Sequence, residues 1–171
     1  MFELHFMPGE YVALRQHLLV SAPREQAAFG FMPKDAVDAG RQLPVKKIEL
    51  LEDGDFVVRS SDYLELTDDA RQRIIRTAHD GSFAVVEFHS HPFNLPAEFS
   101  SADRMGLQRS VPHMLWRLKG RPYLAVVIGP NDFDGLAWLP DKRLFQLSSI
   151  IDGDTLFSAT GRSISRCQSM I

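Results

Sequence analysis

A His-x-His pair and a downstream aspartate are the residues of this chain best suited to chemistry. His89 and His91 flank Ser90 directly after the apolar stretch 83–88, and Asp103 follows a short intervening segment. Residues two apart on a strand point to the same face, so both imidazoles can reach one divalent ion. An aspartate early in a helix supplies a third ligand and leaves a fourth position for water, as in catalytic zinc sites. Bound zinc lowers the pKa of that water to about 7 and polarises a carbonyl.

Each part of this pattern also has an ordinary structural interpretation. A His-x-His pair alone is a weak signal, because two histidines on one strand are often part of the packing. Ser100 stands three residues before Asp103, which is the spacing of a helix capping box. The combination is more specific than either part, since a buried strand precedes the pair and a short loop follows it.

Composition narrows the chemistry further. The chain has 171 residues and a single cysteine, Cys167, which excludes an internal disulfide and a cysteine-rich zinc site. Lys and Arg total 19 against 22 Asp and Glu, so the net charge of −3 gives no general footprint for nucleic acid or an anionic membrane. The sequence shows no membrane-span pattern and no signal-peptide pattern. We therefore expect a cytoplasmic protein without a nucleic-acid or membrane partner. If the chain binds a metal, histidines and carboxylates must be the ligands.

The hydrophobic pattern predicts helices and strands in a mixed order. Helices are expected over 10–20, 67–80 and 100–119. Strands are expected over 26–32, 45–51, 56–58, 83–88, 123–128, 133–139 and 144–151. This order favours an α+β fold, an α/β sandwich in which helices flank a central mixed β-sheet.

Four details of this prediction are specific enough to check. Pro112 is expected to break the helix over 100–119. A turn at Asp53-Gly54 is expected to join 45–51 and 56–58 into a hairpin. The strand over 133–139 is expected at the edge of the sheet. A single domain is expected over 1–151, followed by a loosely ordered tail over 152–171.

The string HSHPFNLPAEFSSAD at 89–103 resembles the JAMM motif of the JAB/MPN-type zinc metalloproteases. That motif combines an upstream Glu with His-x-His-Pro, a loop and Ser-x-x-Asp. The matching positions are His89, His91, Pro92, Ser100 and Asp103. The loop over 92–99 is one residue longer than is usual in the family. The resemblance implies a JAB/MPN-like, cytidine-deaminase-like architecture and one zinc ion per chain, held by His89, His91 and Asp103.

The resemblance also implies a general base and an oxyanion donor. Ser100 would donate a hydrogen bond to the developing oxyanion. Glu25 would take a proton from water and pass it to the leaving amine. Glu25 opens the apolar segment 25–32, which is similar to the family's segment at this place. Glu87 is the rival base, because strand alternation puts it on the same face as His89.

The loop after the histidine pair supplies the candidate substrate contacts, Phe93, Glu98 and Phe99. An apolar loop at this place either packs down on the core or lines a groove for an extended substrate tail. The sequence leaves both alternatives open. A tail bound beside a sheet edge would pair with it as an added strand.

The function implied by the resemblance is that of a zinc-dependent hydrolase, a metalloprotease or isopeptidase that cuts after a ubiquitin-like modifier. Its substrate would be the modifier or its conjugate, and its partners the activating and conjugating enzymes of the same pathway. The small size of the chain resembles that of compact bacterial members of the family, some of which occur in antiviral defence operons. Two other interpretations stay open, a non-catalytic interaction module on the same fold and an unrelated α/β binding domain with a structural histidine pair.

Overall fold

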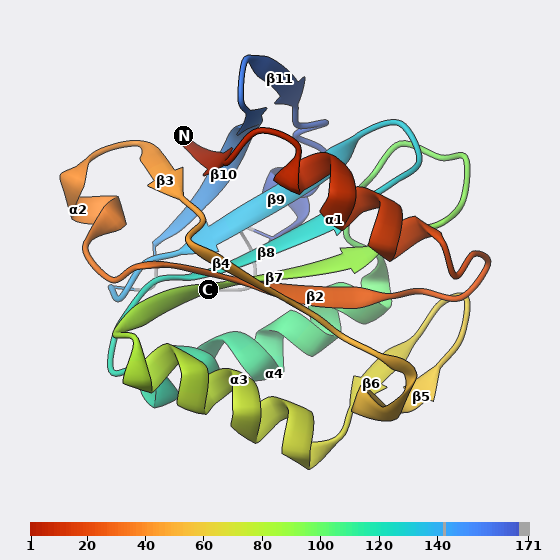
Figure 1. Ribbon diagram of the computed structural model, residues 1–171, viewed down its shortest axis with the longest axis horizontal. Helices are drawn as coiled ribbons and strands as arrows, with labels where there is room; N and C mark the ends of the chain where they lie inside the picture. Colours follow the sequence, from red (N-terminus) through yellow and green to blue (C-terminus); the bar gives the residue numbers. More distant parts are fainter. Residues whose placement is uncertain (142, 168–171) are drawn as a thin grey trace.

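A mixed nine-stranded β-sheet forms the centre of the computed structural model, which describes residues 1–141 and 143–167 (Figure 1). Its strands are β1 (Phe2–Phe6), β2 (Ala27–Pro33), β3 (Gln42–Pro44), β4 (Lys47–Leu50), β7 (Phe83–Ser90), β8 (Tyr123–Ile128), β9 (Phe133–Trp138), β10 (Leu144–Asp152) and β11 (Thr155–Ser158). The order across the sheet is β3-β1-β10-β9-β8-β7-β2-β4, and β11 pairs with β10. A separate two-stranded hairpin consists of β5 (Phe56–Arg59) and β6 (Leu64–Leu66).

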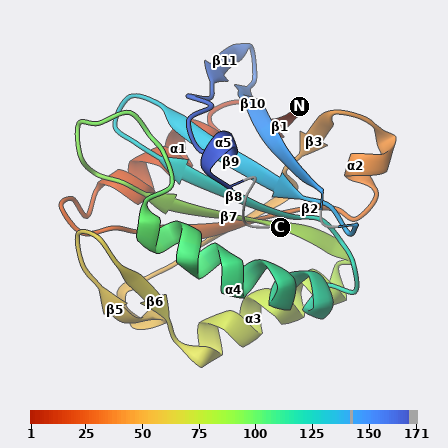
Figure 2. The ribbon, with the colours of Figure 1, turned by 180° about the vertical axis from the view of Figure 1, so that it is seen from behind.

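Helices cover both faces of this sheet. They are α1 (Glu10–Leu19), the short α2 (Ala36–Ala39), α3 (Asp68–Asp80), α4 (Ser101–Arg117) and the short α5 (Ile164–Cys167). The buried side chains of α1 belong to one core cluster. Ile74 and Ala78 of α3 belong to the other, together with the buried side chains of α4 and α5. Figure 2 shows α4 and α5 on the face opposite α1. The fold is therefore α+β with a mixed sheet between helices, as the sequence predicts.

The pairing of β2, β7 and β8 positions the histidine pair. β7 runs antiparallel to β2 and parallel to β8, with His89 opposite Ala27 on one side and Val127 on the other. All six residues of β8 are buried, because helices cover both faces of the sheet at this place. Gly30 of β2 lies so close to β7 that an added Cβ would come within 2.7 Å of Val86 Cγ1. The strands that carry the site are thus held in one register by close packing.

Two helices begin with different kinds of cap. The α3 helix is capped locally, because Thr67 Oγ1 accepts a hydrogen bond from the Ala70 backbone N–H over 3.2 Å. The α1 helix is capped by a distant residue. Asp152, at the end of β10, accepts hydrogen bonds from the N–H groups of Gly9 and Val12 at 2.7 and 3.2 Å. The start of α1 therefore depends on the C-terminal part of the chain.

The α4 helix runs through Pro112 without a break, which corrects the predicted interruption. Pro112 lies on the exposed face of α4, and so does Gln108, whose carbonyl loses its helical partner to the proline. Leu107 and Leu115 are buried on either side of the proline and fix both halves of the helix against the sheet. Solvent access to the freed carbonyl, together with this packing, accounts for the continuous helix.

The predicted pairing of two strand segments is also wrong. β4 pairs with β2, while β5 pairs with β6. The turn between β4 and β5, Asp53–Asp55, is a 3-10 helix with a capping box to Glu52, and it leads the chain away from the sheet. Likewise, β9 is an internal strand between β8 and β10, since all six of its residues are buried and β10 pairs along its other side.

The described part of the predicted tail, residues 152–167, is folded onto the domain. It contains the end of β10, then β11 and α5, and it buries Ser163 and Cys167. This contradicts a loosely ordered tail for these residues, and 168–171 lie outside the described residues. The N-terminal strand β1, which pairs in parallel with β10, was not predicted. None of the described helices combines the length and apolar character needed to cross a lipid bilayer.

Candidate metal centre

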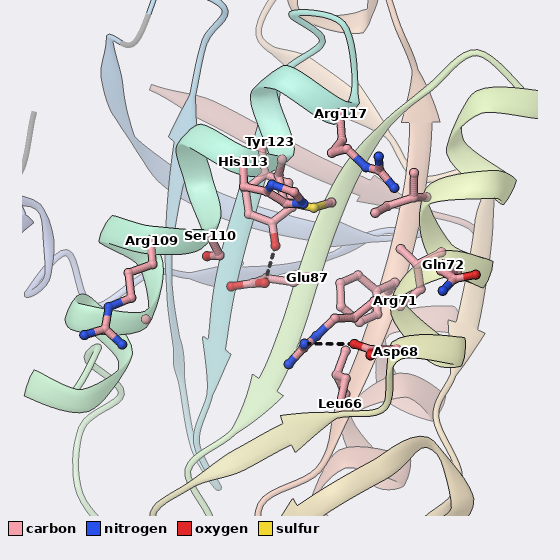
Figure 3. A pocket seen from close by; sticks show the side chains of 15 residues that line it. Leu66, Asp68, Arg71, Gln72, Glu87, Arg109, Ser110, His113, Arg117 and Tyr123 are labelled. Carbon is pink, nitrogen blue, oxygen red and sulfur yellow. Dashed lines mark hydrogen bonds and ion pairs between the residues drawn. The ribbon is translucent and has the colours of Figure 1, made fainter.

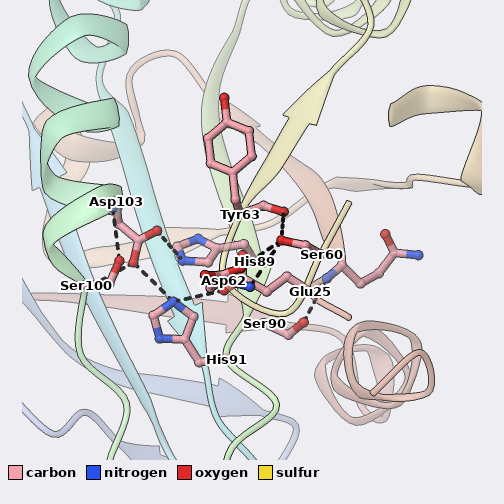
Figure 4. A network of polar contacts seen from close by, with 10 residues as sticks. Glu25, Ser60, Asp62, Tyr63, His89, Ser90, His91, Ser100 and Asp103 are labelled. Atoms are coloured by element: carbon pink, nitrogen blue, oxygen red, sulfur yellow. Dashed lines mark hydrogen bonds and ion pairs between the residues drawn. The ribbon is translucent and has the colours of Figure 1, made fainter. Parts of the chain in front are cut away.

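The histidine pair lies where β7 meets the loop to α4. Ser90, between the two histidines, is fully buried, and its Oγ accepts a hydrogen bond from the Gln26 backbone N–H over 2.9 Å. The N–H of His91 donates to the carbonyl of Ile128 at 2.9 Å, so the main chain stays tied to β8 beyond the end of β7. Both imidazoles consequently point from a fixed backbone toward the start of α4 (Figure 4).

His89, His91 and Asp103 converge on one point. One ligand atom from each lies within 4.8 Å of the other two. His91 Nε2 is 3.1 Å from Asp103 Oδ2, and His89 Nε2 is 3.6 Å from Asp103 Oδ1. His89 Nε2 is buried and has no hydrogen-bond partner within the described part of the chain. Two imidazole nitrogens and a carboxylate form a donor set that fits a divalent cation. The buried His89 Nε2, unpartnered in the described structure, supports this interpretation, because buried polar atoms normally have a partner.

Asp103 has a second, structural role at the start of α4. Its Oδ2 accepts a hydrogen bond from the Ser100 N–H at 2.7 Å, and Ser100 Oγ accepts one from the Asp103 N–H at 3.1 Å. The capping box considered from the sequence is therefore present. The capping box holds Asp103 Oδ2 at the Ser100 backbone N–H, and Asp103 Oδ1 faces His89. The capping box and metal binding are compatible roles of the same residue.

Glu25 reaches the same centre from the segment directly before β2. Continuing the antiparallel register beyond Ala27 and His89 brings Glu25 next to His91. Its Oε1 lies 3.6 Å from His91 Nε2, and its side chain is buried. Its backbone N–H donates to the carbonyl of Ser60, in the β5–β6 hairpin, at 2.7 Å. The structure thus places the predicted base beside a predicted ligand.

The rival base, Glu87, has a different partner. It accepts a hydrogen bond from the Tyr123 hydroxyl on the neighbouring strand. The two side chains line a cavity of about 520 Å³ between α3 and α4, with His113 and Arg117 also in its wall (Figure 3). Burial raises the pKa of the Glu87 carboxyl, and the Tyr123 hydrogen bond opposes this shift. Among the described residues, Glu25 rather than Glu87 forms an ion-pair contact with a histidine of the centre.

The three predicted substrate contacts lie in different environments. Phe93 is 45% exposed and stays a candidate for contact with substrate. Glu98 is partly buried, and its Oε2 lies 3.4 Å from Arg166 Nη1 near the C-terminus. Phe99 is 1% exposed and packs in the core, with its ring centroid 5.8 Å from that of His89. Its burial contradicts the prediction that Phe99 contacts substrate, because the loop packs down at this residue.

Sequence reasoning missed the hairpin turn that borders the centre. Ser60, Asp62 and Tyr63 form a small hydrogen-bonded turn next to Glu25 (Figure 4). Asp62 and Tyr63 join Glu25 in the lining of a cavity of about 380 Å³ that also contains His89 and Asp103. No local sequence signal indicates this contact, since the turn reaches the site through the fold of the β5–β6 hairpin.

A family of known proteins matches most of this chain. The family model Prok-JAB, prokaryotic homologs of the JAB domain, matches residues 9–139, well over half of the chain. The chain belongs to this family. The JAB family includes peptidases, and the His-His-Asp group of this JAB domain is compatible with a metal site.

A solved structure shares the JAB-domain fold described above. The solution structure of protein DSY2949 from Desulfitobacterium hafniense is 16% identical, with a TM-score of 0.54. The similarity covers 86% of this chain and 91% of that protein, and at this identity it concerns the fold. A comparison with curated proteins gives no match.

In the absence of a metal, the charged side chains of the JAB centre shift one another's pKa values. Burial lowers the pKa of the His89 imidazole, but the interactions with Asp103 and the negative charges of Glu25 and Glu87 together outweigh it and raise the pKa to about 9. Burial raises the pKa of the Asp103 carboxyl, but the two imidazoles hold that pKa well below its usual range. Burial raises the pKa of Glu25, against the opposing effect of both imidazoles. In the metal-free protein, His89 is therefore protonated at neutral pH.

The affinity of this JAB centre for a divalent cation such as zinc should increase with pH. An imidazole that binds a metal ion must be neutral, so binding at this centre would release the His89 proton whenever the pH is below about 9. We expect the apparent affinity to rise about tenfold per pH unit below that pKa and then to level off. Competition with a chromophoric chelator at several pH values measures this dependence. An affinity that does not change with pH would contradict a protonated His89 in the zinc-free protein.

Proposed function

We propose that this protein is a zinc-dependent metallopeptidase, a JAMM-type isopeptidase that hydrolyses a peptide or isopeptide bond after a ubiquitin-like modifier. The observation that carries the proposal is the convergence of His89, His91 and Asp103 with the Glu25 carboxylate 3.6 Å from His91. A structural metal site needs the ligands alone. A carboxylate placed beside them, with a raised pKa, supports hydrolytic chemistry.

Each side chain has a role that its contacts allow. His89, His91 and Asp103 would hold one zinc ion. Bound zinc supplies an acidified water and polarises the substrate carbonyl. Glu25 would accept the proton of the attacking water and return it to the leaving amine, and its burial brings its pKa closer to neutrality, which suits a base.

Ser100 is suited to the oxyanion. Its Oγ already accepts a hydrogen bond from the Asp103 N–H, which leaves the hydroxyl proton free to donate. A donor held at a helix start needs little reorganisation when charge develops on the carbonyl oxygen. Ser100 would therefore stabilise the transition state while it caps α4.

The substrate chain would approach through the cavity of about 380 Å³ beside the centre. This cavity runs between the β5–β6 hairpin and α4, and its lining includes Leu66 and Arg109. We infer that the tail of the modifier or its conjugate occupies it, with Phe93 at the exposed loop and partly buried Glu98 as further contact candidates. Pathway partners would be activating and conjugating enzymes in the cytoplasm, in a defence or other bacterial pathway.

A non-catalytic interaction module is the second candidate. The observation that favours it is the capping box, because Ser100 and Asp103 already have structural partners without a metal. The two candidates differ in turnover. A module would bind a modifier without cutting it, whether or not zinc is present.

Cleavage of a modifier fusion tests the proposal. The purified protein is incubated with ubiquitin-like proteins fused through their C-terminal tails to a reporter, with and without a chelator. We expect cleavage after the modifier, loss of cleavage with chelator, and recovery when zinc is restored. Cleavage that is unaffected by removal of zinc would contradict the proposal. Zinc-bound protein that binds the fusions without cutting any of them would favour the module.

A further inference from the structure

The loop from β7 to α4 is held in place by side chains from elsewhere in the chain. The loop contains no helix or strand, yet Ala97 and Phe99 are each only 1% exposed. Buried backbone groups need hydrogen-bond partners, and a loop has no ladder to supply them. The partners of these two residues therefore determine where the loop lies.

Two hydroxyl groups from the C-terminal segment supply part of these partners. Thr160 Oγ1 donates to the Ala97 carbonyl at 2.6 Å. Ser163 Oγ accepts from the Phe99 N–H at 2.9 Å. We call residues 159–167 the C-terminal clamp.

The clamp is itself anchored on the central sheet. The Thr160 N–H donates to the Phe133 carbonyl at 2.9 Å, and the Ser163 N–H donates to Asp134 Oδ2 at 2.8 Å. Asp134 is fully buried in β9. The α5 helix, which ends the clamp, lies on the same face of the sheet as α4 (Figure 2) and buries Cys167 there. The two hydroxyls are consequently fixed relative to β9.

Phe99, the loop residue that is hydrogen-bonded to Ser163, is connected to the metal centre in two ways. Phe99 directly precedes Ser100, the cap of the helix that carries Asp103. Its ring also packs against His89, with 5.8 Å between centroids. A shift of the Phe99 backbone would therefore displace the start of α4. It would also displace the Phe99 ring that packs against the His89 imidazole.

We propose that Thr160 and Ser163 are positioning residues of the metal centre. They set the geometry of Asp103 and His89 by fixing the backbone of the intervening loop. Neither residue touches the ligands, and both lie beyond residue 139, where the match to the family ends. The inference rests on the proposed metal site, and it adds a part of the chain beyond the residues matched by the family model to what that site requires.

Zinc affinity and the visible spectrum of the cobalt-substituted protein test this role. Ser163→Ala removes the acceptor of the Phe99 N–H, and Thr160→Val removes the donor to the Ala97 carbonyl. We expect each to lower zinc affinity about tenfold, the lower end of the loss seen for residues that orient metal ligands. We also expect altered cobalt absorption bands. Thr160→Ser retains the hydroxyl and should restore the parent affinity.

Ser148→Ala is the matched control. Ser148 Oγ donates to the Phe2 carbonyl at 3.1 Å and ties β10 to β1, away from the loop. Ser148→Ala removes a half-buried hydroxyl that contacts Phe2 and Ser149 Oγ, and it keeps the Ser148 carbonyl that accepts a hydrogen bond from the Ala159 N–H. It should lower thermal stability without changing zinc affinity or the cobalt spectrum.

The possible results distinguish failure of the inference from failure of the proposed function. Parent zinc affinity in both clamp variants, or an equal loss in Ser148→Ala, would overturn it while leaving the proposed function intact. A parent protein that binds no zinc would overturn both. A parent that binds zinc without cleaving any fusion would overturn the proposed activity alone, because the affinity comparison does not depend on turnover.

Discussion

Replacing Glu25 with Gln should slow cleavage by about 10²–10⁴-fold, the usual contribution of a general base, while zinc stays bound. The amide has nearly the shape of the carboxylate but cannot take a proton from water. Glu25 does not belong to the three-residue group that converges on the metal position, so its loss should not empty the site. Steady-state kinetics and zinc content, measured on the same preparation, check both parts of the prediction.

Glu87→Gln is the matched control for this prediction. It makes the same chemical change at another glutamate near the centre, whose carboxylate accepts a hydrogen bond from Tyr123. A Gln side chain can still accept that hydrogen bond, so we expect cleavage close to that of the parent. If instead Glu25→Gln cleaves like the parent and Glu87→Gln does not, the base is Glu87.

Truncation of His91 to Ala should remove bound zinc. His91 Nε2 is 3.1 Å from Asp103 Oδ2 and 3.6 Å from Glu25 Oε1, so its loss removes a ligand and leaves two carboxylates without their shared imidazole. We expect a loss of affinity greater than about 100-fold, beyond the largest loss usual for residues that only orient a ligand. Chelator competition measures the affinity, and cleavage should disappear with the zinc.

His113→Ala serves as the control for this change. His113 is an exposed histidine on α4 that packs against Trp116 and does not belong to the converging group. It should retain zinc at the parent affinity. Equal zinc binding by the His91→Ala variant would show that the ion sits elsewhere.

The convergence of His89, His91 and Asp103 could be predicted from sequence because its information is local. A strand period of two places His89 and His91 on one face, and a helix start places Asp103 three residues after its cap. The central strands β7 and β8 are nearly continuous apolar runs, which is typical of strands buried on both faces. These features need no knowledge of distant contacts.

The different contacts of Glu25 and Glu87 depend on the three-dimensional pairing of the strands. Alternation along β7 correctly puts Glu87 on the face that borders the cavities, but it cannot show that Tyr123 supplies its partner. Glu25 comes next to His91 through the register of β2 on β7. Register depends on contacts between segments about 60 residues apart, which a single sequence does not display.

The errors in topology have the same origin. The Asp53-Gly54 turn signal is local, yet β4 pairs with β2 and β5 pairs with β6. The strand β9 was expected at an edge, and its position between β8 and β10 follows from where β10 docks. The hydroxyls of Ser163 and Thr160 stand in a polar, glycine-containing stretch that is typical of a tail. Their partners lie in the loop before α4, about 60 residues away.

Zinc-edge X-ray absorption, combined with elemental analysis of the purified full chain, tests the central claim most directly. One zinc ion per chain is expected, with a coordination shell of nitrogen and oxygen that shows imidazole scattering and no sulfur. Cys167, the sole cysteine, lies outside the converging group, so it should not contribute. Protein that takes up no zinc, or zinc with a sulfur ligand, would contradict a centre built from His89, His91 and Asp103.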